Sequence, residues 1–164
     1  MRDRGPAMSG DRPQDLGALA RSIIDSVMYM ALGTADETGR PWVSPVYYAP
    51  QGYREFFWVS SPEARHSRNL ANRPQVSMVI FDSRTPIGTG QGVYMSAVAG
   101  ELTGAELDRG IEIFSRRSQV HGARAWKHED VRPPAPYRLF RAVASEHSVL
   151  EPGSRPNRRT SVAP

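Results

Sequence analysis

Residues 57–70, FWVSSPEARHSRNL, combine a strand pattern with the start of a helix. The first residues, Phe-Trp-Val, are aromatic and β-branched and favour a strand that ends at two serines. Ser61 and the proline after it are an N-cap and a residue suited to the first helical position, so a helix is predicted to begin at once. Its first two turns carry Arg65, His66 and Arg68, which makes this the most informative local pattern in the chain.

The first turn of this helix is chemically suited to an anion. Its free backbone N–H groups carry a positive partial charge, Ser60 and Ser61 can donate hydrogen bonds, and Arg65 adds charge-assisted ones. Together these groups predict a phosphate-binding site. The alternative is that Ser61 is only an N-cap while Arg65, His66 and Arg68 form a solvated helix face, and the residues alone do not separate the two.

The sequence before this segment predicts one helix and three strands. Apolar residues recur at three- and four-residue spacing over 16–27, which indicates an amphipathic helix. Strands are predicted over 28–35, 41–49 and 54–60 from their β-branched and aromatic content. Turns rich in glycine separate them, so neighbouring strands are expected to pair as hairpins.

The sequence after this segment predicts four more strands and a third helix. The strands are expected over 75–82, 93–102, 137–144 and 147–150. Thr103 and Glu106 form a capping-box pattern for a helix that runs to Val120. Because tight turns between strands require antiparallel pairing, the expected fold class is α+β, mainly β: a small antiparallel barrel with peripheral helices.

Composition predicts one soluble globular domain of 164 residues, since 39% of the residues are hydrophobic and 23% are charged. Residues 1–13 are expected to be a disordered lead-in, 14–151 the folded domain, and 152–164 a flexible basic tail. The apolar runs are too short for a membrane span and the N-terminus lacks the apolar core of a signal peptide, which indicates a cytoplasmic protein.

Several ligand classes are disfavoured by residue type. The chain has no cysteine, and its four histidines do not follow a metal-ligand spacing, so no metal site is expected. The dense basic cluster lies in the tail rather than on a regular element, so nucleic-acid binding is not expected. The loop GTGQG at 88–92 departs from the dinucleotide spacing and precedes a strand, so it is interpreted as a turn at a barrel rim.

Residues 41–70 resemble the flavin-binding split barrels related to pyridoxamine 5'-phosphate oxidase. That family has a segment like RMVLLK on its second strand and YTNYxSRK after its third. Here SPVYYA at 44–49 and VSSPEARH at 59–66 occupy these places, and the spacing LxxxPxVS continues over 70–77. The resemblance implies an FMN-binding split barrel whose cofactor contacts are Ser44, Pro45, Val46, Tyr47, Val59, Ser60, Ser61, Arg65, His66 and Gln91.

Within that set, the resemblance implies different roles. Ser60, Arg65 and His66 would hold the flavin phosphate, and the backbone from Pro45 to Tyr47 would face the isoalloxazine ring. His66 replaces a lysine of the family, so part of the phosphate affinity would depend on a group that titrates near pH ~6.5.

Other departures bear on the substrate. Ser44 and Ala49 stand where the oxidase has an arginine and a lysine, and no counterpart of its C-terminal substrate-binding pattern is present. Oxidation of vitamin B6 phosphate is therefore not expected. The sequence resembles small members of the family that bind either FMN or the deazaflavin coenzyme, factor 420, and leaves both cofactors open.

The expected function is a flavin-dependent oxidoreductase that acts on an unidentified small molecule, as a homodimer with the cofactor at the interface. One alternative is a reductase that uses the deazaflavin factor 420 as cosubstrate, and another is a non-catalytic flavin- or haem-binding carrier or sensor. Haem is disfavoured by the missing cysteine and by the lack of an evident axial histidine, with His147 as the residue to test.

Aromatic residues near the expected site have two readings. Trp58 is assigned to the core, and Tyr47 and Tyr48 cannot both face one site because strand positions alternate. Trp126, in the irregular stretch 121–136, is a candidate for the substrate cleft or an anchoring aromatic of a surface loop.

Overall fold

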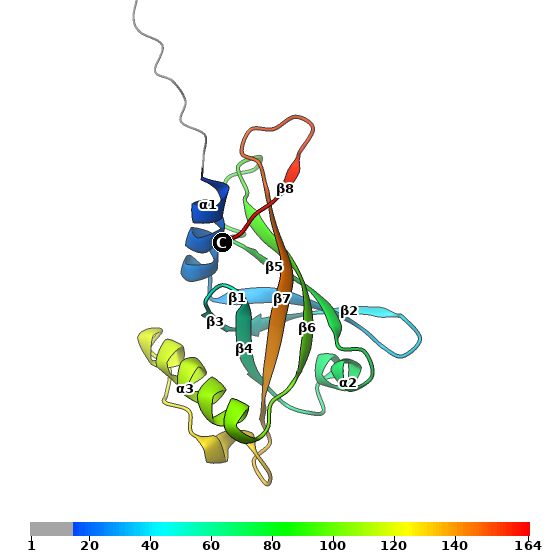
Figure 1. The fold of residues 1–164 in the computed structure, drawn as a ribbon, viewed down its shortest axis with the longest axis vertical. Coiled ribbons are helices and arrows are strands. Elements are labelled where there is room, and N and C mark those ends of the chain that lie inside the picture. Colours follow the sequence, from blue (N-terminus) through cyan, green and yellow to red (C-terminus); the bar gives the residue numbers. More distant parts are fainter. Residues whose placement is uncertain (1–14) are drawn as a thin grey trace, which may run out of the picture.

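The structure, a computed structural model, describes residues 15–164. The predicted lead-in, residues 1–13, lies outside the described residues. One antiparallel sheet, in the order β2-β1-β5-β6-β7-β4-β3 with β8 paired to β7, curls into a half-barrel, and three α-helices lie around it (Figure 1). This confirms the predicted class of an antiparallel split barrel with peripheral helices.

The elements follow one another along the chain with short connections. The helices are α1 (Leu16–Ser26), α2 (Arg65–Asn72), α3 (Gly104–Val120) and the short 3-10 helix η1 (His128–Val131). The strands are β1 (Tyr29–Ala35), β2 (Pro41–Tyr47), β3 (Ala49–Gln51), β4 (Glu55–Ser60), β5 (Gln75–Phe81), β6 (Gly92–Glu101), β7 (Arg138–Leu150) and β8 (Arg159–Ser161).

Alternation along the strands builds the core. On β1, Met30 and Leu32 are buried while their neighbours point outward, and Met78 on β5 faces Leu32 across the antiparallel pair. A second, smaller apolar cluster lies under α3, where Ile111 and Phe114 are buried. Trp58 is fully buried and stacks on Phe140, which confirms its assignment to the core.

The predicted start of α2 is wrong, and the capping box predicted for α3 does not form, although α3 begins after Thr103 as expected. α2 begins at Arg65 rather than beside Ser61, whose hydroxyl accepts the Glu63 N–H within a turn that precedes the helix. Thr103 is the N-cap of α3 but its side chain makes no capping hydrogen bond. Glu106, the expected second half of that capping box, binds Arg141 instead.

The C-terminal part of the sheet also differs from the prediction. The two strands expected over 137–144 and 147–150 are a single strand, β7, which continues through a register shift opposite Ser96 and Ala97. The tail 152–164, expected to be flexible, contains β8, and Val162 packs against the core. In Figure 1 the C-terminus accordingly lies beside α1.

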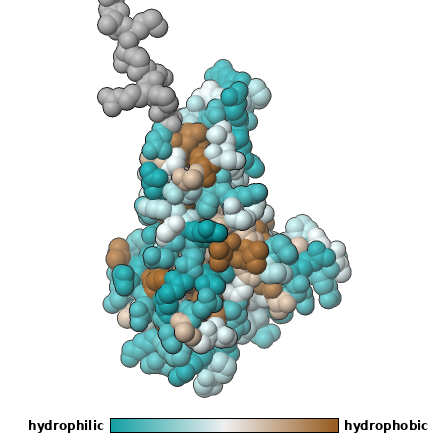
Figure 2. All heavy atoms as spheres, viewed as in Figure 1, coloured by the Kyte–Doolittle hydropathy of each residue, from teal (hydrophilic) through white to brown (hydrophobic). Residues whose placement is uncertain are grey.

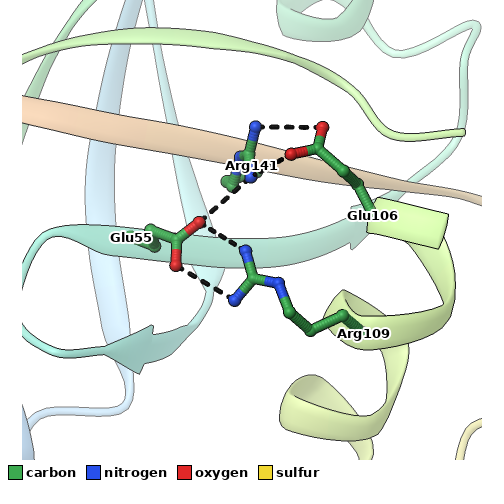
Figure 3. A network of polar contacts seen from close by, with 4 residues as sticks. All are labelled: Glu55, Glu106, Arg109 and Arg141. Atoms are coloured by element: carbon green, nitrogen blue, oxygen red, sulfur yellow. Dashed lines mark hydrogen bonds and ion pairs between the residues drawn. The ribbon is translucent and has the colours of Figure 1, made fainter.

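Four charged side chains fasten α3 to the sheet (Figure 3). Arg109 donates two hydrogen bonds to Glu55, at 2.6 and 3.1 Å. Arg141 on β7 donates to Glu55 at 3.0 Å and to Glu106 at 2.9 and 3.2 Å. The hydrogen bonds from Arg109, followed by the charge of both arginines, lower the pKa of the Glu55 carboxyl.

Replacing Arg141 with methionine is expected to lower the free energy of unfolding by about 1–2 kcal/mol, because it removes charge-assisted hydrogen bonds to two carboxylates, one of them on an exposed side chain. Chemical denaturation measures the change. Arg116→Met, on the exposed face of α3, is the matched control and should change stability by less than about 0.5 kcal/mol. Equal losses in the two variants would contradict this role of Arg141.

None of the helices in residues 15–164 combines the length and apolar character needed to cross a bilayer.

Candidate functional site

A hydrogen-bonded cluster joins the start of α2 to the end of β4 and the middle of β2. His66, in the first turn of α2, is 8% exposed. Its Nε2 lies 2.8 Å from the hydroxyl of Ser60 at the end of β4, and its Nδ1 lies 3.1 Å from the hydroxyl of Ser44 on β2. The structure therefore brings together Ser44, Ser60 and His66, three of the residues predicted to contact the cofactor.

An arginine and a tryptophan extend this cluster toward solvent. The indole Nε1 of Trp42 donates a hydrogen bond of 3.0 Å to the Ser44 hydroxyl. The guanidinium of Arg65 lies 4.4 Å from the centroid of the Trp42 ring, a cation–π contact. Arg65 thus stands beside the hydroxyl cluster, with its guanidinium held against an aromatic face.

The orientation of α2 depends on a buried polar contact that the sequence analysis missed. Asn69 donates a hydrogen bond of 2.9 Å from its side-chain amide to the hydroxyl of Thr34 on β1, and both side chains are buried. Buried amides need such partners, so this bond fixes the helix relative to the sheet. An asparagine one turn after His66, on the same helix face, is the signal that could have identified it.

The donors at this place suit an anion. The first backbone hydrogen bond of α2 runs from the Arg68 N–H to the Ala64 carbonyl, so the amides of residues 65–67 are not used inside the helix. Those amides, the Ser60 hydroxyl and the Arg65 guanidinium are the groups that bind phosphate at helix N-termini. The fit to a phosphate therefore rests on hydroxyl, amide and guanidinium donors.

Burial affects the imidazole of His66, which the sequence analysis expected to titrate near pH ~6.5. Burial lowers the pKa of His66 below its ordinary value of 6.5, so the ring is neutral at pH 7. No carboxylate lies among its hydrogen-bond partners to counter this effect. The isolated cluster is thus a neutral hydrogen-bonding group beside one arginine.

Burial of a neutral imidazole makes stability depend on pH. Because the pKa of His66 is lower in the folded than in the unfolded chain, the unfolded chain binds more protons as the pH falls below 6.5. The free energy of unfolding should therefore decrease between pH 7.5 and pH 5.5, with a smaller decrease in His66→Gln. Urea denaturation at the two pH values measures this, and an equal slope in the variant would contradict it.

The other predicted contacts on β2 lie on an edge strand. β2 pairs with β1 on one side only, so the backbone from Pro45 to Tyr47 has a second edge without a strand partner in residues 15–164. Val46 is buried in the core. The phenol of Tyr47 lies 2.9 Å from His121 Nδ1 at the end of α3, a pair that the sequence did not predict.

Val59, Ser61, Gln91 and Trp126 lie apart from the hydroxyl cluster. Val59 packs against the smaller apolar cluster under α3, and the Ser61 hydroxyl is engaged in its turn. Gln91 precedes β6 at the end remote from Ser60, a strand length of about 30 Å away. Its side-chain oxygen is buried without a hydrogen-bond partner, beside a cavity of about 410 Å³.

Trp126 is packed among aromatic side chains at the edge of a hollow beside α3. Its ring meets Phe114 and Tyr137 edge-on, and its backbone N–H donates to the Ser115 hydroxyl. It also lines a hollow of about 590 Å³ against α3, together with His128 and Asp108, whose Nε2 and Oδ1 atoms lie 3.0 Å apart. The prediction that it lines the substrate cleft is not tested by this placement.

A cavity of about 870 Å³ lies beside β7 and the C-terminal strand. His147 lines it and donates from Nε2 to the Tyr53 carbonyl at 2.7 Å, so its Nδ1 holds the free lone pair. Burial is the largest effect on the pKa of His147 and lowers it. Residues 15–164 contain no group of three or more His, Asp or Glu side chains placed to hold a metal ion.

Comparison with known proteins identifies the family. The family model of pyridoxamine 5'-phosphate oxidase matches residues 16–149. This covers well over half of the chain, which therefore belongs to the pyridoxamine 5'-phosphate oxidase family. Among curated relatives, the chain is 43% identical to heme oxygenase HutZ of Vibrio cholerae over 58 residues, which are 34% of this chain and 31% of HutZ.

Solved structures share the fold. A heme binding protein from Mycobacterium smegmatis matches with a TM-score of 0.69 at 21% identity, over 93% of this chain and 59% of that one. The heme storage protein HutZ from Vibrio cholerae matches with a TM-score of 0.67 at 21% identity, over 85% and 96%. A putative pyridoxamine 5'-phosphate oxidase from Listeria innocua matches with a TM-score of 0.62 at 13% identity, over 82% and 98%.

Proposed function

We propose that this protein binds FMN and is a flavin-dependent oxidoreductase acting on a small molecule. The observation that carries the proposal is the Ser44–His66–Ser60 cluster beside Arg65 and the unused amides of α2. It offers donors suited to a phosphate at the place where the sequence resembles the phosphate segment of the family. Membership of the pyridoxamine 5'-phosphate oxidase family supports the same cofactor class.

In this proposal the chain anchors and orients the cofactor, and the bound flavin supplies hydride chemistry. Ser60, Arg65 and the amides of residues 65–67 would hold the phosphate, and His66 would fix the two serine hydroxyls. The free backbone edge from Pro45 to Tyr47 would hold the polar rim of the ring. No catalytic acid or base is assigned.

Vitamin B6 phosphate does not suit the residues present. Ala49, which stands where the oxidase has a lysine, is fully buried in the apolar cluster under α3. Ser44 is already engaged with His66 and Trp42. The two cations of the oxidase thus have no replacement at these positions, so we propose a substrate without that phosphate.

We further propose a homodimer with the cofactor at its interface. The residues of β1, β2, β5 and β6 that alternate away from the core include no charged side chain, and four of them are about half exposed or more: Tyr29, Val43, Phe81 and Val98. Figure 2 shows apolar residues gathered beside the base of the β1–β2 hairpin. Gln91 can reach a flavin at the Ser60 end only from a second copy.

Val98→Glu is expected to convert this dimer to a monomer, because it places a charge on an uncharged face that the second copy would cover. Light scattering after size-exclusion chromatography measures the mass. Val120→Glu, equally apolar and 78% exposed on α3, should leave the mass unchanged. A wild-type protein that is monomeric at micromolar concentration would overturn the dimer.

Two other cofactors are alternatives to FMN. The deazaflavin factor 420 also carries a phosphate and would use the same donors. Haem is favoured by the names of the relatives HutZ and the Mycobacterium smegmatis protein, and by one observation on this chain. His147 lines the cavity of about 870 Å³, and a backbone carbonyl fixes its tautomer, as it does in histidines that ligate metals.

Absorbance titrations of the purified protein with FMN, factor 420 and haem decide among them. If the proposal is correct, FMN binds saturably and the bound flavin is reduced by NADH or NADPH. Binding of factor 420 alone would replace FMN, and a haem spectrum lost in His147→Ala but kept in His128→Ala would replace both. Flavin that binds but is not reduced would make the protein a carrier.

A further inference from the structure

The hydrogen bonds of His66 can be counted atom by atom. A neutral imidazole has one N–H donor and one lone pair, and each serine hydroxyl has one proton. One of the two serines must therefore donate to His66 while the other accepts from it. Whichever tautomer is present, only one serine proton remains free to donate to a ligand.

Trp42 leaves this count unchanged. Its indole N–H can only donate, so Ser44 accepts from Trp42 with one lone pair and meets His66 with its proton or its second lone pair. Ser60 has no second side-chain partner among the described residues. In the neutral state, therefore, one serine can donate its hydroxyl proton to an anion. The other serine has already donated its proton to His66 and presents only an oxygen lone pair to the anion.

Protonation changes the donor set. An imidazolium donates from both nitrogens, so both serines accept from it and both hydroxyl protons are released toward a ligand. The ring then also carries a positive charge one hydrogen bond away from the ligand. The protonated cluster thus offers a dianionic phosphate two hydroxyl donors and a positive charge. The neutral cluster offers it one donor and one lone pair that repels it.

None of the charged groups packed around α2 favours protonation of His66 in the absence of a ligand. β1, β2 and β4 present Thr34, Ser44 and Ser60 to the helix, none of them charged. Two acids near α2 are paired, Glu63 with Arg68 at 3.8 Å on its own side and Glu101 with Arg138 at 3.6 Å at the end of β6. A third acid, Glu37, accepts a hydrogen bond through its backbone carbonyl from Arg73 at the far end of the helix. The cation beside the cluster is Arg65, and no carboxylate lies among the hydrogen-bond partners of His66 to favour its protonation before an anion binds.

We propose that a phosphate-bearing ligand binds at this cluster together with one proton, which His66 takes up from solvent. This deepens the proposed function and rests on it. The proton forms the second N–H bond of the imidazole, and no other bond changes. His66 therefore makes the site selective for a phosphomonoester dianion. At the same position the family has a lysine, which is charged before the ligand binds.

Calorimetric titration with FMN at pH 7.5, in two buffers of different ionisation enthalpy, measures the proton count. The expected result is uptake of about one proton per FMN, and an FMN dissociation constant that rises about tenfold per pH unit above neutrality. Riboflavin, which lacks the phosphate, should bind without uptake. His128→Gln, a histidine remote from the cluster, should keep the uptake of the wild type.

His66→Gln separates the two places where the proton could go. An amide can bridge both serines but cannot become charged, so FMN should bind more weakly and without proton uptake. Uptake that persists in this variant would place the proton on the phosphate and overturn the inference. FMN binding without uptake in the wild type would overturn the inference while leaving the proposed function intact.

Inorganic phosphate gives a test that does not depend on FMN. The imidazole signals of His66, followed by NMR, should titrate at a higher pH in the presence of saturating phosphate than in chloride of equal ionic strength. An unchanged titration overturns the inference. Absence of FMN binding together with the raised titration would overturn the proposed cofactor and keep the anion site.

Discussion

Trp58→Ala is expected to lower the free energy of unfolding by about 3–5 kcal/mol, the usual cost of truncating a fully buried tryptophan. The indole is 0% exposed and stacks on Phe140 with ring centroids 5.7 Å apart and planes at 15°. The loss comes from removed apolar contacts and from the cavity left between β4 and β7. Urea denaturation, followed by circular dichroism, measures it.

Two further variants serve as controls for the stability loss expected in Trp58→Ala. Trp58→Phe keeps a stacked ring and should lose less, so the order of stabilities is informative even where the alanine variant does not fold. Trp42→Ala, at a tryptophan that is 40% exposed, should cost less than about 1.5 kcal/mol. A loss at Trp58 no larger than the loss at Trp42 would contradict the assignment of Trp58 to the core.

Arg65→Ala is expected to weaken FMN binding by about 1.5–3 kcal/mol, which is roughly 10- to 150-fold in the dissociation constant. The guanidinium is the charged donor beside the Ser44–His66–Ser60 cluster, and its contact with Trp42 holds it there. Quenching of flavin fluorescence on titration measures the affinity. The unfolding midpoint should change little, since Arg65 makes no ion pair within the described residues.

Arg68→Ala is the matched control for this variant. Arg68 lies one turn further along α2, is 63% exposed and pairs with Glu63. Its removal should change FMN affinity by less than threefold, since surface ion pairs contribute about 0–1 kcal/mol. Equal effects at Arg65 and Arg68 would indicate attraction by net charge and contradict a defined phosphate site.

Local patterns in the sequence predicted most of the fold. Apolar, β-branched and aromatic content identified the strands, and on β1 and β5 the structure shows core residues alternating with outward-facing ones. The break predicted between residues 144 and 147 was wrong. In the structure Ala97 pairs with Ala144 and Ser96 with Glu146, so Ser145 is the extra residue of a bulge and the strand continues.

The candidate site was predicted in its parts but not in its connections. Ser60 and His66 are six residues apart, so their proximity follows from a strand that runs into a helix. The contact of His66 with Ser44 spans 22 residues and depends on how α2 docks on the sheet, for which no local pattern exists. The same docking buries His66 and lowers its pKa below the value that its residue type suggested.

Comparison of FMN with riboflavin tests the central claim most directly, because the two differ only in the phosphate that the cluster is proposed to hold. The wild type is predicted to bind FMN at least about tenfold more tightly than riboflavin, through charge-assisted hydrogen bonds. In Ser60→Ala and Arg65→Ala this preference should shrink, while the affinity for riboflavin stays the same. Equal affinity for the two flavins in the wild type would contradict the phosphate site.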